Sequence, residues 1–371
     1  MFSNNHEISL RQTFRLFTFD FLGISTLIVP GYLAALGGIY GGLAIAAGIG
    51  MGLAYLAYLS WVLRRMNTDL FTYMDEYGWM KGGLKRVLCL YFAFSCLITA
   101  IDTAVVFTNL IQRSLIREEA YPLILGLMLL VAAYTVSGGI ESRARIYEIL
   151  FWIILIPLFL MLLFALKEMR IEYVFPQKAF DWTMVFRGGY MVFVTWETLF
   201  FVLLFPAYVS ADTKPKALTK SVRGAFLLAG GILMVLYVIL LLTFGENALS
   251  GMEFPAVTLM STVQIAGGFA KRLDAIMMGV WFFTLFALLN LNLHYGSKFL
   301  KKALKKSTKE YLPLAVITLL VFLGAMWVGY YGRGQWLVEK YFAWIGMPLY
   351  IVLPGILVCR RRKGGALRNE K

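Results

Sequence analysis

The sequence predicts an all-α integral membrane protein with ten transmembrane helices. Of its 371 residues, 60% are hydrophobic and 15% are charged, against roughly 45–50% apolar and about 25% charged in ordinary soluble domains. The apolar residues are gathered into runs of about 20, the length that crosses a hydrocarbon core about 30 Å thick. A single water-soluble core is therefore excluded.

Ten apolar runs are the predicted spans. They are Leu10–Leu36, Tyr40–Leu63, Val87–Ile111, Tyr121–Ser137, Ile146–Leu166, Trp182–Tyr208, Gly224–Phe244, Leu273–Leu293, Leu312–Tyr331 and Tyr341–Cys359. The connections between them are short, so we expect no separate soluble domain. Function must then lie within the helical bundle.

The basic residues predict the orientation of the chain. Lys and Arg in short loops stay on the cytoplasmic side of a membrane. With the N-terminus inside, 25 of the 35 Lys and Arg residues fall in inner segments. We therefore expect both termini to be cytoplasmic, in the inner (cell) membrane. This bias also explains the net charge of +14. A nucleic-acid partner is not expected, because the basic residues are dispersed over six short segments without interleaved aromatics.

The first span differs from a plain apolar helix. It carries Asp20, Gly23, Ser25, Thr26 and Pro30. A charged side chain near mid-membrane costs about 2.5–3.5 kcal/mol on insertion scales and usually faces a cavity or a partner. Asp20 lies about ten residues from the inner end of its span, near the middle of the bilayer. It is therefore a candidate for holding a proton or a substrate amine.

The sixth span is irregular in the same way. It carries Thr195, Trp196, Glu197 and Thr198, followed by Pro206. Glu197 lies about fifteen residues from the outer end of the span, roughly 22 Å deep. It is a candidate for substrate binding or proton transfer. The alternative is a structural carboxylate that stabilises a bent helix.

The first and sixth spans open two halves of five helices each. The count of loops places the first half's start inside and the second half's start outside, so the halves have opposite topology. We expect residues 1–170 and 171–363 to form an inverted repeat, followed by a cytoplasmic tail at 364–371. Paired broken helices in such repeats expose half-helix ends and free backbone groups to a central substrate. Positive helix ends suit a carboxylate and unwound carbonyls suit an ammonium group, so an amino acid fits both.

Other polar residues have competing interpretations. Asp102 in the third span is a candidate for ion coupling, or it faces only an external vestibule. Asn290, Asn292 and His294 at the end of the eighth span are expected to form a capped, interfacial helix end. The charged residues Glu141, Arg143, Arg145 and Glu148 are expected to lie in a solvated loop, and the alternatives are a cytoplasmic ion-pair cluster and a docking patch for a partner. The segment Met252–Phe269 is a candidate lid over the site.

No metal, cofactor or catalytic group is expected. The three cysteines are not spaced as a metal knuckle, and His294 has no second intramembrane histidine to share a metal. A membrane enzyme would need a cluster of catalytic side chains at the interface, and the sequence offers only scattered single residues.

Two motifs resemble a known transporter superfamily. Gly23-Ile-Ser-Thr-Leu-Ile-Val-Pro30 resembles the first-helix motif of the amino acid, polyamine and organocation (APC) transporters, and Phe193-Val-Thr-Trp-Glu197 resembles their sixth-helix motif. Ser25 and Thr195 stand where those motifs usually have glycine. Three further segments resemble the GerAB-type spore germination permeases, and they are Glu7–Gln12, Gly139–Arg145 with Glu148, and Lys271–Asp274 leading to Trp281.

The resemblance implies a LeuT-like fold of 5+5 inverted repeats with broken helices 1 and 6. It implies the permease-like subunit of a nutrient germinant receptor in the spore inner membrane, which binds an amino acid or similar nutrient and acts with other receptor subunits. The alternative is a proton-coupled secondary amino-acid transporter. The implied substrate contacts are Gly23, Ser25, Thr26, Thr195, Trp196, Glu197 and Thr198, and the coupling candidates are Asp20, Glu197 and Asp102.

Overall fold

The computed structural model describes residues 7–76, 83–114, 120–175, 179–210, 213–262, 273–304, 309, 311–331 and 340–366. All regular structure in these residues is helical. The longer elements are α1 (Leu10–Gly37), α2 (Gly41–Met66), α4 (Gly83–Ser114), α5 (Tyr121–Ser137), α6 (Gly139–Ala165), α7 (Trp182–Val194), η5 (Glu197–Ala207), α8 (Pro215–Ser250), α10 (Leu273–Ala303), α11 (Tyr311–Tyr331) and α13 (Met347–Ala366). The shorter ones are η1 (Gly38–Tyr40), α3 (Leu70–Glu76), η3 (Leu166–Glu168), η4 (Ile171–Val174), α9 (Pro255–Thr262) and the π-helix η7 (Phe342–Gly346).

Eight of the described helical segments are long and apolar enough to cross a membrane. The first of them, Leu10–Met66, has 57 residues and contains both α1 and α2. Helix α5 is apolar but shorter, with 17 residues. The chain is therefore a multi-pass membrane protein. The count of ten spans and the division into two repeats remain predictions.

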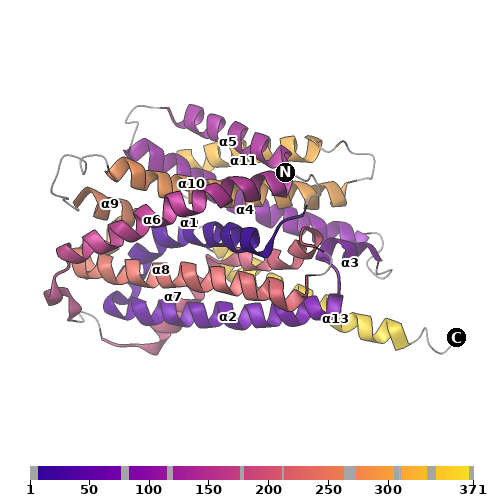
Figure 1. The fold of residues 1–371 in the computed structure, drawn as a ribbon, viewed down its shortest axis with the longest axis horizontal. Helices are drawn as coiled ribbons and strands as arrows, with labels where there is room; N and C mark the ends of the chain where they lie inside the picture. The colour runs from indigo at the N-terminus through magenta and orange to yellow at the C-terminus, as the bar shows by residue number, and fades with distance from the viewer. Residues whose placement is uncertain are drawn as a thin grey trace.

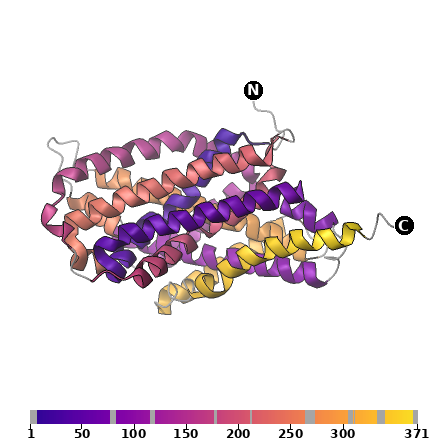
Figure 2. The ribbon, with the colours of Figure 1, turned by 90° about the horizontal axis from the view of Figure 1, so that it is seen from below.

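The long helices run side by side along the long axis of the molecule (Figures 1 and 2). Helix α1 lies inside the bundle, packed against α6, α8 and α10. Helix α3 and the C-terminus lie at one end, on the right in Figure 1. Exposed apolar side chains such as Leu130, Ile149 and Leu319 cover the outer helices, as expected for a surface that faces lipid.

Helix α1 begins with a capping box. The Ser9 hydroxyl accepts a hydrogen bond from the Gln12 backbone N–H at 3.2 Å, and the Gln12 side chain accepts one from the Ser9 N–H at 2.9 Å. The helix then continues to Gly37 without a non-helical residue. The predicted break in the first helix is therefore not present in this structure. Hydroxyl groups and neighbouring helices satisfy the backbone groups that proline and glycine would otherwise leave open.

The predicted break in the sixth helix is confirmed. Helix α7 ends at Val194, Thr195 and Trp196 form a turn, and the chain continues as the 3₁₀ helix η5 from Glu197. Runs of 3₁₀ helix longer than a few residues are uncommon and often mark a hinge or strain. With 11 residues, η5 exceeds that length, so this span is irregular over its second half.

Two expectations about helix ends are wrong. Helix α10 does not end at Leu293 but continues to Ala303, and the side chains of Asn290, Asn292 and His294 are buried rather than interfacial. They are tolerated there because some of their polar atoms find partners in the bundle: Asn292 Nδ2 donates to the Leu288 carbonyl at 2.9 Å, and His294 Nε2 lies 3.3 Å from the Tyr208 hydroxyl. The run Glu141–Glu148 is not a loop, because it forms the first turns of α6.

The segment predicted as a lid is partly described. Helix α9 covers Pro255–Thr262 and packs against α1, α8 and α10. Residues 263–269 of that segment lie outside the described residues, as do Lys271 and Arg272 of the third motif.

Candidate functional site

The turn between α7 and η5 places Glu197 in the interior. The Thr99 hydroxyl of α4 donates a hydrogen bond to Glu197 Oε1. Glu197 Oε2 and the neighbouring Thr198 hydroxyl are buried and have no hydrogen-bond partner among the described residues. Asp102, one turn beyond Thr99 on α4, is also buried and lies close enough for its charge to act on Glu197. The structure thus brings together two of the predicted coupling residues.

Trp196 connects this turn to α1. Its indole Nε1 donates to the Phe21 carbonyl at 3.1 Å, and its ring meets Phe226 edge-on at a centroid distance of 4.7 Å. The side chain is completely buried. Its polar atom is therefore already engaged, and Trp196 ties the turn to α1 rather than offering a free donor to a ligand.

The hydroxyls of the first-helix motif also have partners. Ser25 Oγ donates to the Phe21 carbonyl at 2.5 Å, and Thr26 Oγ1 donates to the Leu22 carbonyl at 2.6 Å. Thr26 Oγ1 also accepts a hydrogen bond from Trp281 Nε1 of α10 at 3.1 Å. In this conformation these hydroxyls stabilise α1 and its contact with α10.

Gly23 and Thr195 also have structural roles in this conformation. A Cβ added at Gly23 would lie 3.3 Å from the Thr284 carbonyl oxygen, so glycine permits a close approach of α1 to α10. The Thr195 hydroxyl donates to the Val192 carbonyl of its own helix at 2.7 Å. Of the predicted substrate contacts, Glu197 and Thr198 are the two with free polar atoms.

Asp20 belongs to a second polar cluster. Its carboxylate accepts a hydrogen bond from Arg143 Nη2 of α6, and the same nitrogen donates to the Ala287 carbonyl of α10 at 3.0 Å. The Asp20 and Arg143 side chains are 0% and 3% exposed. This ion pair joins three helices at the place where the sequence predicted a lone carboxylate.

Arg143 is the functional candidate that sequence reasoning missed. The sequence predicts a solvated loop there, with an ion-pair cluster or a docking patch as alternatives, yet a mid-membrane carboxylate requires a partner. Arg143 and Tyr147 are four residues apart and so share one face of a helix, and the guanidinium lies 5.7 Å from the centre of the Tyr147 ring. This helical spacing was the feature of the sequence that could have indicated a helical position for Arg143.

Several buried polar atoms of the pair and its surroundings have no hydrogen-bond partner among the described residues. They are Asp20 Oδ2, Arg143 Nε and Nη1, and the Tyr295 hydroxyl. The Tyr147 hydroxyl lies close to Asn290 and Arg143. Buried polar groups are normally hydrogen-bonded, so an orphan group calls for an explanation such as water or a ligand. The interior therefore holds two polar regions, one at Asp20 and one at Glu197.

The first turns of α1 are held against α6. Gln12 Nε2 donates to Glu148 Oε2 at 2.9 Å, and Arg15 Nη1 donates to the Glu148 carbonyl oxygen at 3.0 Å. Arg145 pairs with Glu141 one turn away on α6. The charged run before the fifth span thus makes intramolecular contacts.

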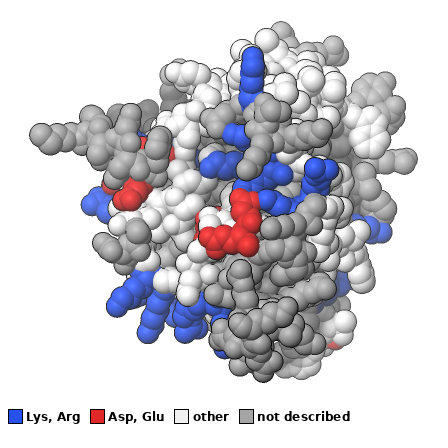
Figure 3. Space-filling model, turned by 90° about the vertical axis from the view of Figure 1, so that its right-hand side faces the viewer, with Lys and Arg blue, Asp and Glu red and all other residues white. Residues whose placement is uncertain are grey.

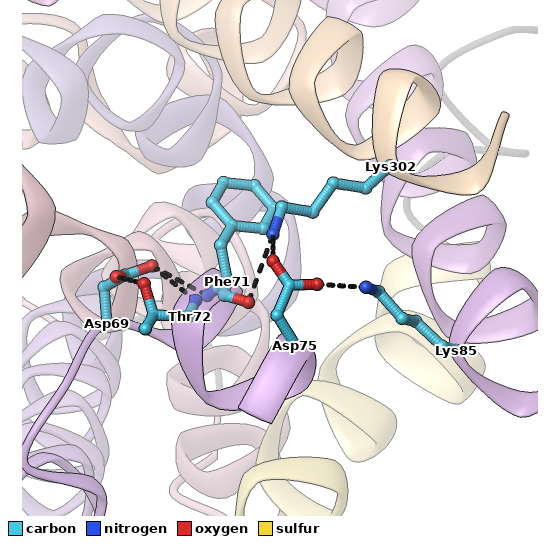
Figure 4. Close-up of polar contacts among 6 residues, drawn as sticks. All are labelled: Asp69, Phe71, Thr72, Asp75, Lys85 and Lys302. Carbon is cyan, nitrogen blue, oxygen red and sulfur yellow. Dashed lines mark hydrogen bonds and ion pairs between the residues drawn. The ribbon is translucent and has the colours of Figure 1, made fainter. Parts of the chain in front are cut away.

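Helix α3 is held by lysine side chains of two other helices (Figure 4). Asp75 accepts hydrogen bonds from Lys85 of α4 and Lys302 of α10, and Lys302 also donates to the Phe71 carbonyl at 3.1 Å. Partial burial raises the pKa of Asp75, but the hydrogen bonds and charges of Lys302 and Lys85 outweigh it and hold this pKa below its usual value. Among the described residues there is no group of three or more His, Cys, Asp or Glu side chains that could hold a metal ion.

Comparison with known sequences decides the family. Residues 7–328 match the model of the family Spore_permease, described as spore germination protein. The chain belongs to the spore germination permease family. A curated relative, spore germination protein B2 of Bacillus subtilis (strain 168), is 24% identical over 296 residues, which are 76% of this chain and 75% of that protein. This is a permease family and not an enzyme family.

Solved structures place this permease in the LeuT-like transporter fold. The crystal structure of MhsT in complex with L-phenylalanine matches with a TM-score of 0.67 and 13% identity, covering 95% of this chain and 88% of MhsT. A Na⁺-coupled sialic acid symporter matches with a TM-score of 0.58 and 12% identity, covering 95% of this chain and 76% of the symporter. At these identities the likeness shows the fold alone.

Proposed function

We propose that this permease is the ligand-binding membrane subunit of a nutrient germinant receptor. It binds an amino acid or a similar zwitterion between α1, α4 and the turn before η5, and it passes the binding signal to other receptor subunits in the spore inner membrane, with both of its own termini cytoplasmic. The observation that carries the proposal is the pair of buried, unpartnered polar groups at this turn, Glu197 Oε2 and the Thr198 hydroxyl.

Glu197 is suited to a ligand's ammonium group. Its Oε1 is already oriented by Thr99, which leaves Oε2 as an acceptor for one N–H. Asp102 adds negative charge to the same region. A ligand ammonium that donates to Oε2 would compensate the buried carboxylate, and hydrogen bonds between charged partners are stronger than neutral ones.

The ligand carboxylate requires α1 to open at Gly23–Thr26. Opening frees backbone N–H groups there. The carbonyl groups that had accepted hydrogen bonds from them still accept hydrogen bonds from side chains. The Phe21 carbonyl is held by Ser25 Oγ and Trp196 Nε1, and the Leu22 carbonyl by Thr26 Oγ1. The cost of breaking the helix is thereby reduced, because an unpaired backbone group in the bilayer is expensive. MhsT, which shares the fold, was crystallised with L-phenylalanine, consistent with an amino acid as the ligand.

The second candidate function is a proton-coupled amino-acid transporter. Buried carboxylates favour it, because Asp20 and Glu197 lie on two different helices of the interior and each has an unpartnered oxygen. Carboxylates inside membrane proteins often mark proton pathways. Both functions use one fold and one site, and they differ in whether the ligand crosses the membrane.

Transport and binding assays on the same purified protein test the two functions. A panel of labelled amino acids is offered to proteoliposomes with an imposed pH gradient, beside equilibrium binding to wild type, Glu197→Gln and Asp20→Asn. Glu172→Gln, an exposed carboxylate on η4, is the control. Saturable binding without accumulation, lost in Glu197→Gln and kept in Glu172→Gln, supports the receptor. Uptake that exceeds the binding stoichiometry and collapses without the gradient supports the transporter. Failure of the whole panel to bind contradicts both.

A further inference from the structure

A basic groove lies between α2 and α8, apart from the interior site. It has a volume of about 380 Å³, within the range of pockets that bind small molecules. Its walls are Leu53, Leu56, Ala57, Ser60 and Arg64 of α2, and Lys216, Thr219, Lys220 and Arg223 of α8. None of these described lining residues is acidic.

The groove changes in character along its length. The α2 residues Leu53, Leu56 and Ala57 form an apolar part. Next, the hydroxyls of Ser60 and Thr219 lie 3.2 Å apart and join the two helices. Arg64 and Lys216 lie on the far side of these hydroxyls, whereas Lys220 and Arg223 follow Thr219 on the antiparallel α8 and so lie beside the apolar part. An apolar wall with four cations beside it matches the acyl chain and the phosphate of a phospholipid.

Helical spacing explains why the charges converge. Lys216, Lys220 and Arg223 follow one another at intervals of four and three residues, so they share one face of α8. Arg64 faces them from α2, where its Nε donates to the Ser60 carbonyl at 3.2 Å. Pro215 occupies the first turn of α8, and the helix N-terminus adds partial positive charge to the groove.

These charges are accessible, and no described acidic residue pairs with them. All four basic side chains are exposed, and within the described part of the chain none forms an ion pair. Figure 3 shows Lys and Arg gathered on the end of the molecule that carries α3. The retention of basic residues on one side of the membrane explains their number, but it does not explain their convergence on one groove with an apolar section.

We infer that this groove binds an anionic phospholipid. The phosphate lies among Arg64, Lys216, Lys220 and Arg223, and part of an acyl chain lies along Leu53, Leu56 and Ala57. Basic pockets between transmembrane helices are known recognition sites for anionic lipid headgroups. A bound lipid would link α2 to α8, and α8 packs along α1, so lipid composition would act on the helix that carries Asp20.

Native mass spectrometry of the full-length purified protein in neutral detergent tests this inference. Phosphatidylglycerol and phosphatidylcholine are titrated separately. We expect phosphatidylglycerol to bind more tightly, and each neutralised charge to weaken its binding roughly five-fold. The test variant is Lys220→Gln with Arg223→Gln. The matched control is Arg86→Gln with Arg187→Gln, which removes two exposed charges outside the groove.

A steric variant separates a lipid from a free anion. Ala57→Trp fills the apolar section without changing the charge, so it should abolish phospholipid binding. The thermal unfolding midpoint is then measured with inorganic phosphate in place of lipid. The inference is overturned if phosphate stabilises wild type as much as phosphatidylglycerol does, if phosphatidylcholine binds equally well, or if the control pair loses binding as the test pair does. An acidic peptide that binds while phosphatidylglycerol does not would assign the groove to a protein partner instead.

Discussion

Arg143 of α6 donates a hydrogen bond to Asp20 of α1 in the interior of the bundle, and the same guanidinium nitrogen bonds the Ala287 carbonyl of α10. Each charge makes the other tolerable, because an isolated ion in a low-dielectric interior is costly. The pair therefore ties α1 to two neighbouring helices. Any movement of α1 during binding must either carry this pair along or break it.

The first prediction concerns this ion pair. Replacing one partner leaves the other charge buried and uncompensated, so Arg143→Met should destabilise the protein by about 3–5 kcal/mol. The double variant Asp20→Leu with Arg143→Met should recover most of that loss, because two apolar groups need no compensation. Unfolding in detergent measures all three variants in a double-mutant cycle.

The pair Glu141–Arg145, whose side chains are 14% and 39% exposed, is the control for that cycle. Arg145→Met should cost no more than about 1 kcal/mol, as exposed ion pairs do. If the effects of Asp20→Leu and Arg143→Met simply add, the two side chains do not form a coupled pair.

The second prediction concerns Trp196. Trp196→Phe keeps the aromatic contact with Phe226 but removes the hydrogen bond to the Phe21 carbonyl. We expect a loss of stability of about 1 kcal/mol, together with weaker amino-acid binding, since the Phe21 carbonyl loses one of its two side-chain donors when α1 opens. Trp344→Phe, at a largely exposed position, should change neither quantity. Unchanged affinity in Trp196→Phe would separate this bond from ligand binding.

The third prediction uses two glycines on α2. A Cβ at Gly48 would lie 2.8 Å from both the Gly189 carbonyl oxygen and the Val192 side chain of α7, whereas a Cβ at Gly50 would meet nothing within 4 Å. Small residues allow transmembrane helices to approach closely. Gly48→Val should therefore destabilise the protein by about 1–3 kcal/mol through overpacking, and Gly50→Val should not. Equal unfolding temperatures for the two variants would contradict this packing of α2 against α7.

The fourth prediction is a pH dependence at α3. The pKa of Asp75 is lowered in the folded protein, so its bonds to Lys85 and Lys302 stabilise the fold at any pH above the unfolded value of about 3.9. The difference in unfolding temperature between wild type and Asp75→Asn should thus stay constant from about pH 7 to pH 5. It should shrink as the pH falls below about 4 and through the folded pKa.

Glu76→Gln, the next residue of α3 and also exposed, is the control for Asp75→Asn. The expected effect of Asp75→Asn is small, no more than about 1 kcal/mol, because its side chain is 49% exposed and solvent screens the pair. A difference that grows on acidification would reverse the sign of this linkage and contradict the prediction.

The class, the approximate positions of the spans and the break in the sixth helix were predictable from the sequence. Long apolar runs report burial in lipid directly, and the polar segment Thr195–Thr198 interrupts one of them. The helix ends were less predictable. The sequence pattern places Asn290, Asn292 and His294 at the end of a span, since a hydropathy pattern does not distinguish an interfacial polar residue from one buried against a partner in the bundle.

The sequence by itself determined that this chain crosses a membrane many times, that it carries carboxylates inside the bilayer and that its motifs are those of germination permeases. These properties follow from local composition and spacing. Only the tertiary structure decided what each polar group contacts: Asp20 pairs with Arg143 from 123 residues away, α1 remains continuous, and Glu197 keeps an oxygen free. Such pairings depend on which helices pack together, and that is set by the whole bundle rather than by any one segment.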